Sequence, residues 1–219
     1  MPRKHPSGSA TREPLAFALG TPAKVSALRA LAGAGEPLSQ RDIARRAGVQ
    51  HRSARLALDE LVLLGIVSRQ VGGRDYLVRL NDAHRLAPAL RELFSAEAGH
   101  FLDLRRHLAA VAAAGAGRAR LVSVALFGSV ARARDLPASD CDLLVVARDA
   151  PGLARALEDF RRVGAALRDS IGCRLSPVGY TRADAARRWR VRSAPFSDIR
   201  RDALVVYGPP LEEEFRDAR

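Results

Sequence analysis

The sequence predicts an α/β (α+β) protein with an N-terminal helical domain and a C-terminal mixed sheet flanked by helices. Three stretches with the helical spacing of apolar residues lie within residues 21–64, and a hairpin pattern follows them. Within residues 121–207, apolar runs of strand length alternate with helical stretches, which is typical of a sheet covered by helices. We therefore expect a flexible arm at 1–13, a helical domain with a hairpin at 14–82, connector helices at 83–117 and an α/β domain at 118–219.

The composition excludes several classes of protein. Of the 219 residues, 47% are hydrophobic, which is enough for folded cores and excludes a disordered chain. No uncharged run approaches the roughly 18 apolar residues of a membrane-spanning helix. We therefore expect a cytoplasmic protein without a membrane segment. The two cysteines are too few for a disulfide framework or a cysteine-based zinc site. The net charge of +12 favours a polyanionic partner such as DNA, RNA or a nucleoside triphosphate.

Three helices are expected at the start of the N-terminal domain. Thr21 can cap the first helix, with Pro22 at its first position. Ser39 followed by Asp42 resembles a capping box that opens a short second helix, and Gly48 ends that helix. The third helix starts within residues 50–53, and its apolar face consists of Ala54, Ala57, Leu58, Leu61 and Leu64.

A hairpin follows the third helix, with strands expected at 67–70 and 75–80 around a Gly72–Gly73 turn. Three helices, a short turn between the second and third, and a glycine-tipped hairpin form the layout of a winged helix-turn-helix. The stretch LSQRDIARRAGVQHRSARLALDELVLLGIV resembles the winged-helix domains of small bacterial transcription regulators.

The winged-helix resemblance implies that the third helix contacts DNA. The candidate DNA-binding residues are Gln50, His51, Arg52, Ser53 and Arg55, together with the wing residue Arg74, which can touch the DNA backbone or the minor groove. Winged helices also serve as protein–protein modules, so a protein partner is the alternative for this domain.

Residues 83–114 form a helix-prone segment with one apolar stripe. Such a helix either connects the two domains or forms a homodimer through its stripe. The stripe consists of Leu90, Phe94, Ala98, Phe101, Leu104, Leu108 and Val111.

The C-terminal domain is expected to alternate between strands and helices. Strands and helices that alternate in this way indicate an α/β domain. The pattern predicts strands at 121–127, 141–147, 174–180 and 203–207, and helices at 153–171 and from 181 onward.

One turn in this domain combines glycine, serine and nearby carboxylates. An apolar strand ends at Gly128–Ser129, and Asp140 and Asp142 open the next strand. Side chains at i and i+2 of a strand face the same side, so the two carboxylates project together while Cys141 points the other way. Two such carboxylates can hold divalent cations. Gly128 lets the backbone approach a phosphate, whose oxygens can bind the following amides and the Ser129 hydroxyl. The residues predict a site for a metal-chelated triphosphate.

The stretch LFGSVARARDLPASDCDLLV resembles the signature of the minimal nucleotidyltransferases, within the DNA polymerase β nucleotidyltransferase superfamily. The resemblance implies that Gly128 and Ser129 bind a nucleoside triphosphate, with ATP expected, and that Arg132 is the family arginine of the same turn. It also implies that Asp140 and Asp142 bind Mg²⁺ and carry catalysis.

The reaction implied by this resemblance is in-line attack of an acceptor hydroxyl on the α-phosphate, with release of pyrophosphate. The acceptor can be a protein side chain, a small molecule or an RNA end. Minimal nucleotidyltransferases often act as antitoxins that nucleotidylate a helical partner toxin, so a partner toxin is among the expected partners.

Two residues depart from the nucleotidyltransferase pattern. Ala133 replaces the glycine that usually follows the family arginine. The strand expected to carry a third carboxylate reads CRLSPVGYT, with Ser176 at that position, and no acidic residue occurs between Asp169 and Asp184. Two hypotheses follow: a DNA-binding nucleotidyltransferase, or a catalytically inactive transcription regulator that uses the nucleotidyltransferase fold as a nucleotide sensor.

Several other residues have a structural interpretation beside a functional one. Arg132 and Arg134 fit a solvated face as well as a phosphate contact. The cysteines Cys141 and Cys173 are interpreted as small buried hydrophobic residues that adjacent strands can bring together. An exposed helix face is favoured over a grip on nucleic acid for the arginines around Trp189, namely Arg187, Arg188, Arg190 and Arg192.

Overall fold

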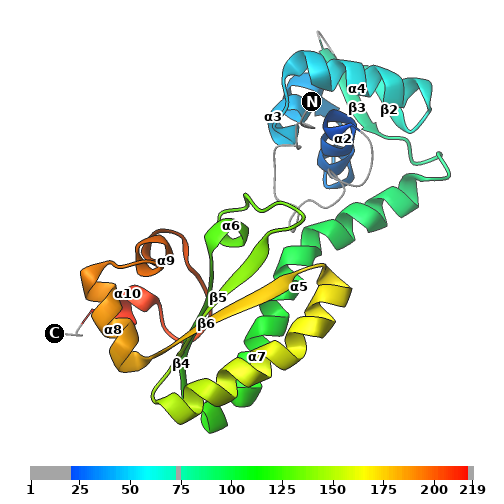
Figure 1. Cartoon of the computed structure of the whole chain (residues 1–219). Coiled ribbons are helices and arrows are strands. Elements are labelled where there is room, and N and C mark those ends of the chain that lie inside the picture. The colour runs from blue at the N-terminus through cyan, green and yellow to red at the C-terminus, as the bar shows by residue number, and fades with distance from the viewer. Residues whose placement is uncertain (1–20, 73–74, 217–219) are drawn as a thin grey trace. The chain divides into compact units, whose positions relative to one another are not determined.

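The computed structural model describes residues 21–72 and 75–216, which divide into two compact units (Figure 1). Unit 1 ends at Gly99 and unit 2 begins at His100. The predicted arm at 1–13 and the wing residue Arg74 lie outside the described residues.

Unit 1 consists of helices that pack against a small antiparallel sheet. The sheet has the order β1-β3-β2, and β2 and β3 form the predicted hairpin. Together with the three helices this hairpin makes a winged helix, as the sequence predicted. The elements are α2 (Pro22–Ala32), β1 (Leu38–Ser39), α3 (Gln40–Ala47), α4 (His51–Leu63), β2 (Val67–Gly72) and β3 (Asp75–Leu80).

Two of the local predictions for these helices are confirmed and two differ from the structure. Ser39 caps α3, because its hydroxyl accepts a hydrogen bond from the Asp42 amide at 3.1 Å. Gly48 ends α3 in the left-handed conformation, with φ of 64°. Thr21 occupies the N-cap of α2, but its side chain makes no capping hydrogen bond. Leu64 is 60% exposed rather than buried, because it is the C-cap of α4 and lies beyond the last turn that faces the core.

The connector expected at 83–117 is the single helix α5 (Ala87–Ala119), which contributes side chains to the cores of both units. In unit 1, Phe94 packs against Val25 of α2. One turn further, Glu97 is buried and Ala98 is exposed, so the apolar stripe predicted from spacing alone is interrupted there. Glu97 accepts hydrogen bonds from Arg29 at 2.6 and 2.9 Å, which ties α5 to α2 through a nearly buried carboxylate.

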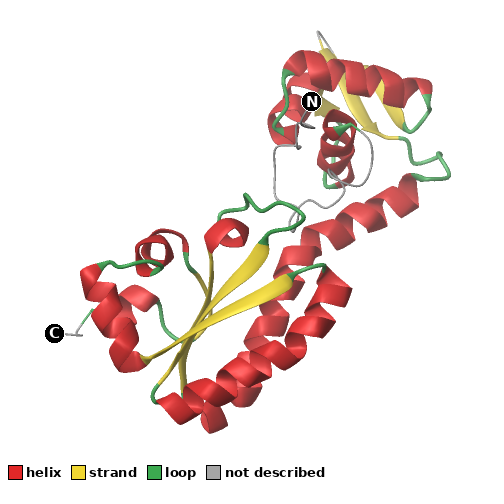
Figure 2. Cartoon of the chain, viewed as in Figure 1, coloured by secondary structure: helices red, strands yellow, loops and turns green. Residues whose placement is uncertain are grey.

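Unit 2 is a mixed sheet with helices on both faces (Figure 2). The strand order is β6-β5-β4-β7; β5 and β6 run parallel, and the other pairs are antiparallel. The mixed sheet flanked by helices is confirmed. The elements are β4 (Leu121–Phe127), α6 (Gly128–Ala131), β5 (Asp140–Ala147), α7 (Ala150–Ile171), β6 (Arg174–Thr181), α8 (Arg182–Val191), α9 (Phe196–Asp202), β7 (Leu204–Tyr207) and α10 (Leu211–Glu214).

Alternation along the central strands divides the core of unit 2 into two layers. In β4, Val124 and Leu126 pack with the residues of α5 and α7, while Ala125 and Phe127 pack with those of α8, α9 and α10. In β5, Cys141 belongs to the first layer. Asp140 and Asp142, one position to either side of Cys141, therefore lie on the face that α8, α9 and α10 cover.

No helix within residues 21–72 and 75–216 combines the length and the apolar character that crossing a membrane requires.

Replacing Glu97 by alanine should destabilise unit 1 by about 3 kcal/mol, because the nearly buried ion pair between the Glu97 carboxylate and Arg29 would be lost. Differential scanning calorimetry of the whole chain measures this. The transition of unit 1 should move to lower temperature while that of unit 2 stays in place. Glu92→Ala, at an exposed position of the same helix, is the control, and equal shifts in the two variants would contradict the prediction.

Candidate functional site

The candidate site is built around a close contact between the turn after β4 and the start of β5. Phe127 of β4 pairs with Asp142 of β5, so the turn that begins at Gly128 lies directly beside the Asp142 carboxylate. Gly128 has a φ of 75°, and a Cβ atom placed on it would overlap Asp142 Oδ2. Any other residue would displace the acid, so the glycine predicted for phosphate approach is also what permits the carboxylate to stand there.

The two predicted acids face the same side and influence each other. Burial raises the pKa of Asp142, repulsion from Asp140 raises it further, and the positive charge of Arg132 opposes both effects. The structure thus brings together Asp140, Asp142 and Gly128. A cation beside the two carboxylates would relieve their repulsion.

Two arginines at the site, Arg174 and Arg132, are paired with carboxylates. The Nε of Arg174, at the start of β6, donates a hydrogen bond to Oδ1 of Asp140. This pair is exposed, with 66% of the arginine side chain and 36% of the aspartate side chain accessible, so it is weak and exchangeable. Arg132 instead donates to Oδ2 of Asp202 at 2.7 Å. Its guanidinium therefore has a protein partner on α9 rather than lying free toward Gly128.

Asp202 belongs to a compact ion-pair group that sequence reasoning missed. Its side chain is 10% exposed and accepts hydrogen bonds from both Arg132 and Arg201. Hydrogen bonding to Arg201 lowers the pKa of Asp202; burial opposes this effect and Arg132 adds to it. Asp202 lies 70 residues beyond Arg132 in the chain, and no local pattern marks the pairing.

Ser129 stands in the first turn of α6, where it is half-buried. Its carbonyl accepts a hydrogen bond from the Arg134 amide at 2.9 Å, which closes the turn behind the glycine. Ser129 directly follows Gly128, the residue that lies against Asp142, and its hydroxyl is on a short helical turn rather than in an open loop.

Ser176 is the register partner of Asp142 across the parallel pair of β5 and β6. It thus stands on the neighbouring strand at the position expected to carry a third carboxylate. Within the described ranges 21–72 and 75–216, no group of three or more His, Cys, Asp or Glu side chains could hold a metal ion. The donor set of Asp140 and Asp142 fits one Mg²⁺ ion, which binds through one or two carboxylates and completes its coordination with phosphate oxygens and water.

The candidate DNA-binding residues lie on the N-terminal half of α4 and on its N-cap. Gln50, His51, Arg52 and Arg55 are exposed, and Ser53 is half-buried. The neighbouring Ala54 is fully buried against the core, so the helix turns its basic side outward.

Acidic residues on the C-terminal half of α4 are neutralised by cations. Arg69 of the hairpin donates to Asp59 at 2.5 Å, and Arg55 lies 3.8 Å from the same carboxylate. Lys24 of α2 pairs with Glu60. Negative charge on this helix is therefore compensated within unit 1, and Arg52 lies at the end of α4 that carries no acid.

Two further expectations concern the cysteines and the arginines around Trp189. Both cysteines are buried and free. A hydrogen bond to Cys173, together with burial, raises the pKa of the Cys141 thiol, so the adjacent strands do bring the two together. Trp189 is buried under the Arg200 guanidinium, which lies 4.6 Å from its ring. Arg187, Arg190 and Arg192 are exposed, as predicted. Arg188 differs from the prediction, because it is half-buried and its guanidinium lies 5.2 Å from the centre of the Tyr180 ring.

Comparison with known proteins gives one match of limited extent. No protein-family model and no curated protein matches the chain. The crystal structure of a MarR-family transcriptional regulator from Silicibacter pomeroyi is similar over 49% of this chain and 80% of that chain, with 26% identity and a TM-score of 0.34. This TM-score is too low to establish a common fold. The winged helix of unit 1 is therefore assigned from its own elements and strand pairing.

Replacing Asp202 by asparagine should destabilise the protein at neutral pH by about 1 to 2 kcal/mol, because two charge-assisted hydrogen bonds are weakened. The lowered pKa sets the pH dependence: the stabilisation is complete above the ordinary carboxyl value of 3.8 and is lost as the pH falls through the lower folded value. Urea unfolding at pH 7 and at pH 3 checks this. A difference between variant and parent that does not shrink at pH 3 would contradict the assignment.

Proposed function

We propose that this protein is a DNA-binding winged-helix protein whose C-terminal unit binds a magnesium–nucleotide complex. The observation that carries the proposal for unit 2 is the Asp142 carboxylate packed against Gly128, with Asp140 on the same strand face. It supports the predicted nucleotide site because an acid pair that can hold the metal stands beside the glycine turn that can admit a phosphate.

The proposed roles follow from the positions of the side chains. Asp140 and Asp142 hold the ion, and the backbone at Gly128 with the Ser129 hydroxyl binds phosphate oxygens. Bound magnesium would neutralise phosphate charge at this place. Arg174 now balances Asp140, and because this pair is exposed its guanidinium can turn from the carboxylate to a phosphate oxygen.

Nucleotide binding without transfer is the form of the proposal that we favour. Ser176 next to Asp142 supports it, because a serine hydroxyl neither ligates a second ion as a carboxylate does nor accepts a proton readily at neutral pH. The second candidate is nucleotidyl transfer to a hydroxyl acceptor, which the Asp140–Asp142 pair favours. Incubation with magnesium and labelled ATP, with protein and RNA acceptors, decides between them: labelled acceptor supports transfer.

The proposal for unit 1 rests on the basic N-terminal half of α4. Exposed Arg52 and Arg55 belong to the helix that a winged helix places in the major groove. A strongly basic chain, with net charge +12, adds a sequence-independent attraction to DNA phosphates.

A homodimer through α5 would have to use the side chains that the two cores leave exposed. Leu104 and Leu108 of the predicted stripe are fully buried within unit 2, whereas Leu93 and Leu102 are 39% and 44% exposed. Sedimentation of the whole protein, compared with a Leu93→Gln, Leu102→Gln variant, tests the dimer: loss of a dimer in the variant alone supports it.

Replacing Arg52 and Arg55 together by alanine should weaken the affinity for duplex DNA by roughly tenfold or more and flatten its salt dependence. Fluorescence anisotropy measures this with a duplex selected from genomic fragments by the whole protein. Arg106→Ala with Arg161→Ala removes the same charge from exposed positions of unit 2 and is the control. The assignment of α4 to DNA is wrong if both double variants bind alike, or if no duplex is selected.

Replacing Asp142 by asparagine should reduce the affinity for ATP by roughly tenfold in the presence of magnesium and leave the weak metal-free binding unchanged. Calorimetric titration of the whole protein measures both. Since burial and Asp140 disfavour the ionised Asp142, the asparagine variant should remain folded. Asp169→Asn, at an exposed acid of α7, should bind as the parent does.

A second variant in the same titration tests the turn. Gly128→Ala should weaken ATP binding because its Cβ would overlap the Asp142 carboxylate. Gly164→Ala is the control, since its Cβ would meet only Leu175 at 3.8 Å. Parent-like binding by both Gly128→Ala and Asp142→Asn would overturn the site.

A further inference from the structure

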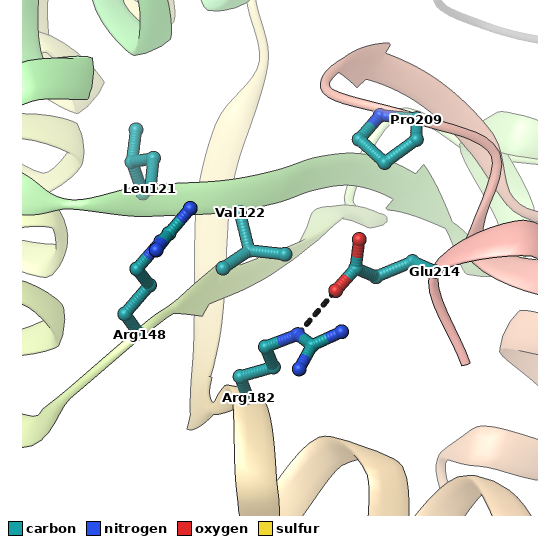
Figure 3. Close-up of a pocket in the computed structure, with 6 residues that line it drawn as sticks. All are labelled: Leu121, Val122, Arg148, Arg182, Pro209 and Glu214. Carbon is teal, nitrogen blue, oxygen red and sulfur yellow. Dashed lines mark hydrogen bonds and ion pairs between the residues drawn. The ribbon is translucent and has the colours of Figure 1, made fainter. Parts of the chain in front are cut away.

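Unit 2 has a pocket at the end of the sheet opposite the aspartates. It has a volume of about 600 Å³ and is lined by Leu121, Val122, Arg148, Arg182, Pro209 and Glu214 (Figure 3). These residues come from the start of β4, the chain just after β5, the start of α8, the turn after β7, and α10. β5 runs from Asp140 to Ala147, which at roughly 3.3 Å per residue separates the pocket from Asp140 by about 23 Å. The proposed nucleotide site and this pocket are therefore separate.

One wall of the pocket is held in place by a close backbone approach. Gly208 has a φ of 88°, and a Cβ on it would overlap the carbonyl oxygen of Val122. Only glycine lets the turn after β7 lie this close to β4, and the next residue, Pro209, lines the pocket. In Figure 3, Leu121 and Arg148 lie on one side and Pro209 and Glu214 on the other. Gly208 and Pro209 therefore fix the position of this wall.

The positive and negative charges of the side chains that line the pocket do not cancel. Arg182 donates from Nε to Oε1 of Glu214 at 2.5 Å, which leaves the two terminal nitrogens of its guanidinium for another acceptor. Arg120, which precedes Leu121, donates from a terminal guanidinium nitrogen to Asp149. Arg148 lines the pocket and has no carboxylate partner within the part of the chain that the structure describes. Two guanidinium groups thus share one carboxylate, and the pocket has an excess of one positive charge.

We propose that this pocket binds a small organic anion. Its acidic group, a carboxylate or a phosphate monoester, is held by Arg148 and by the free nitrogens of Arg182. Its apolar body lies against Leu121, Val122 and Pro209. The volume is within the range of small-molecule sites, and the pocket combines three charged side chains with the apolar side chains of Leu121, Val122 and Pro209. Binding of this ligand requires neither magnesium nor Asp140 nor Asp142.

Calorimetric titration of the whole protein with 1-naphthoate, its neutral analogue 1-naphthamide and inorganic phosphate tests the proposal. The carboxylate should bind saturably. The amide lacks the negative charge and inorganic phosphate lacks the apolar body, so each should bind roughly tenfold more weakly. Arg148→Gln should weaken naphthoate binding by about tenfold. Arg190→Gln, which alters an exposed arginine of α8 outside the pocket, should leave it unchanged.

A variant with the opposite expected effect excludes simple misfolding as the cause. Glu214→Gln removes the acid that competes for Arg182 and should tighten naphthoate binding by about twofold or more. Asp142→Asn should have no effect. The proposal is overturned by absence of saturable naphthoate binding, by equal binding of the amide or of phosphate, or by a Glu214→Gln variant that binds more weakly than the parent.

Discussion

The geometry of the candidate site depends on the contact between Gly128, which follows β4, and the Asp142 carboxylate. The carboxylate occupies the space that a side chain on residue 128 would fill. The register that pairs Phe127 with Asp142 brings the acid against Gly128, and the positive φ of that glycine turns the chain into α6. Backbone hydrogen bonds between β4 and β5 therefore set the position of an ionisable group in the molecule. Because both strands have fully buried core residues on either face, a one-residue slip would exchange the two core layers and move the acid away.

Arginines around this contact form ion pairs with carboxylates. Asp140 is matched by Arg174, and Arg132 is matched by Asp202 on α9. Unit 1 follows the same rule, since Asp59 and Glu60 of α4 are matched by Arg69 and Lys24. Because of this pairing, fewer cations are free than the 36 lysines and arginines of the chain imply. The unmatched ones, such as Arg52 and Arg148, are for this reason the more informative about partners.

The sequence predicts the order and nature of the elements well because local rules decide them. Caps at Ser39 and Gly48, the period of two in β4 and β5, and the i, i+2 placement of Asp140 and Asp142 are properties of short segments. Long-range pairing is different. The contacts of Arg132 with Asp202 and of Arg29 with Glu97 span 70 and 68 residues. Because the chain contains many arginines, no sequence spacing indicates which arginine pairs with a given carboxylate. The pocket at Arg148 could not be predicted from the sequence either, because its walls come from five separate segments.

The two cysteine thiols lie beneath the acid pair, on the other face of the sheet. Cys141 stands between Asp140 and Asp142 in β5, and the neighbouring Cys173, which precedes β6, raises the pKa of its thiol. Both are buried, and the raised pKa of Cys141 keeps its thiol protonated, so an alkylating reagent can modify it only when the two strands separate. The native protein therefore contains its own chemical reporter of local opening. The rate of alkylation records how often this edge of the sheet opens, and any ligand that holds the acids in place must slow it.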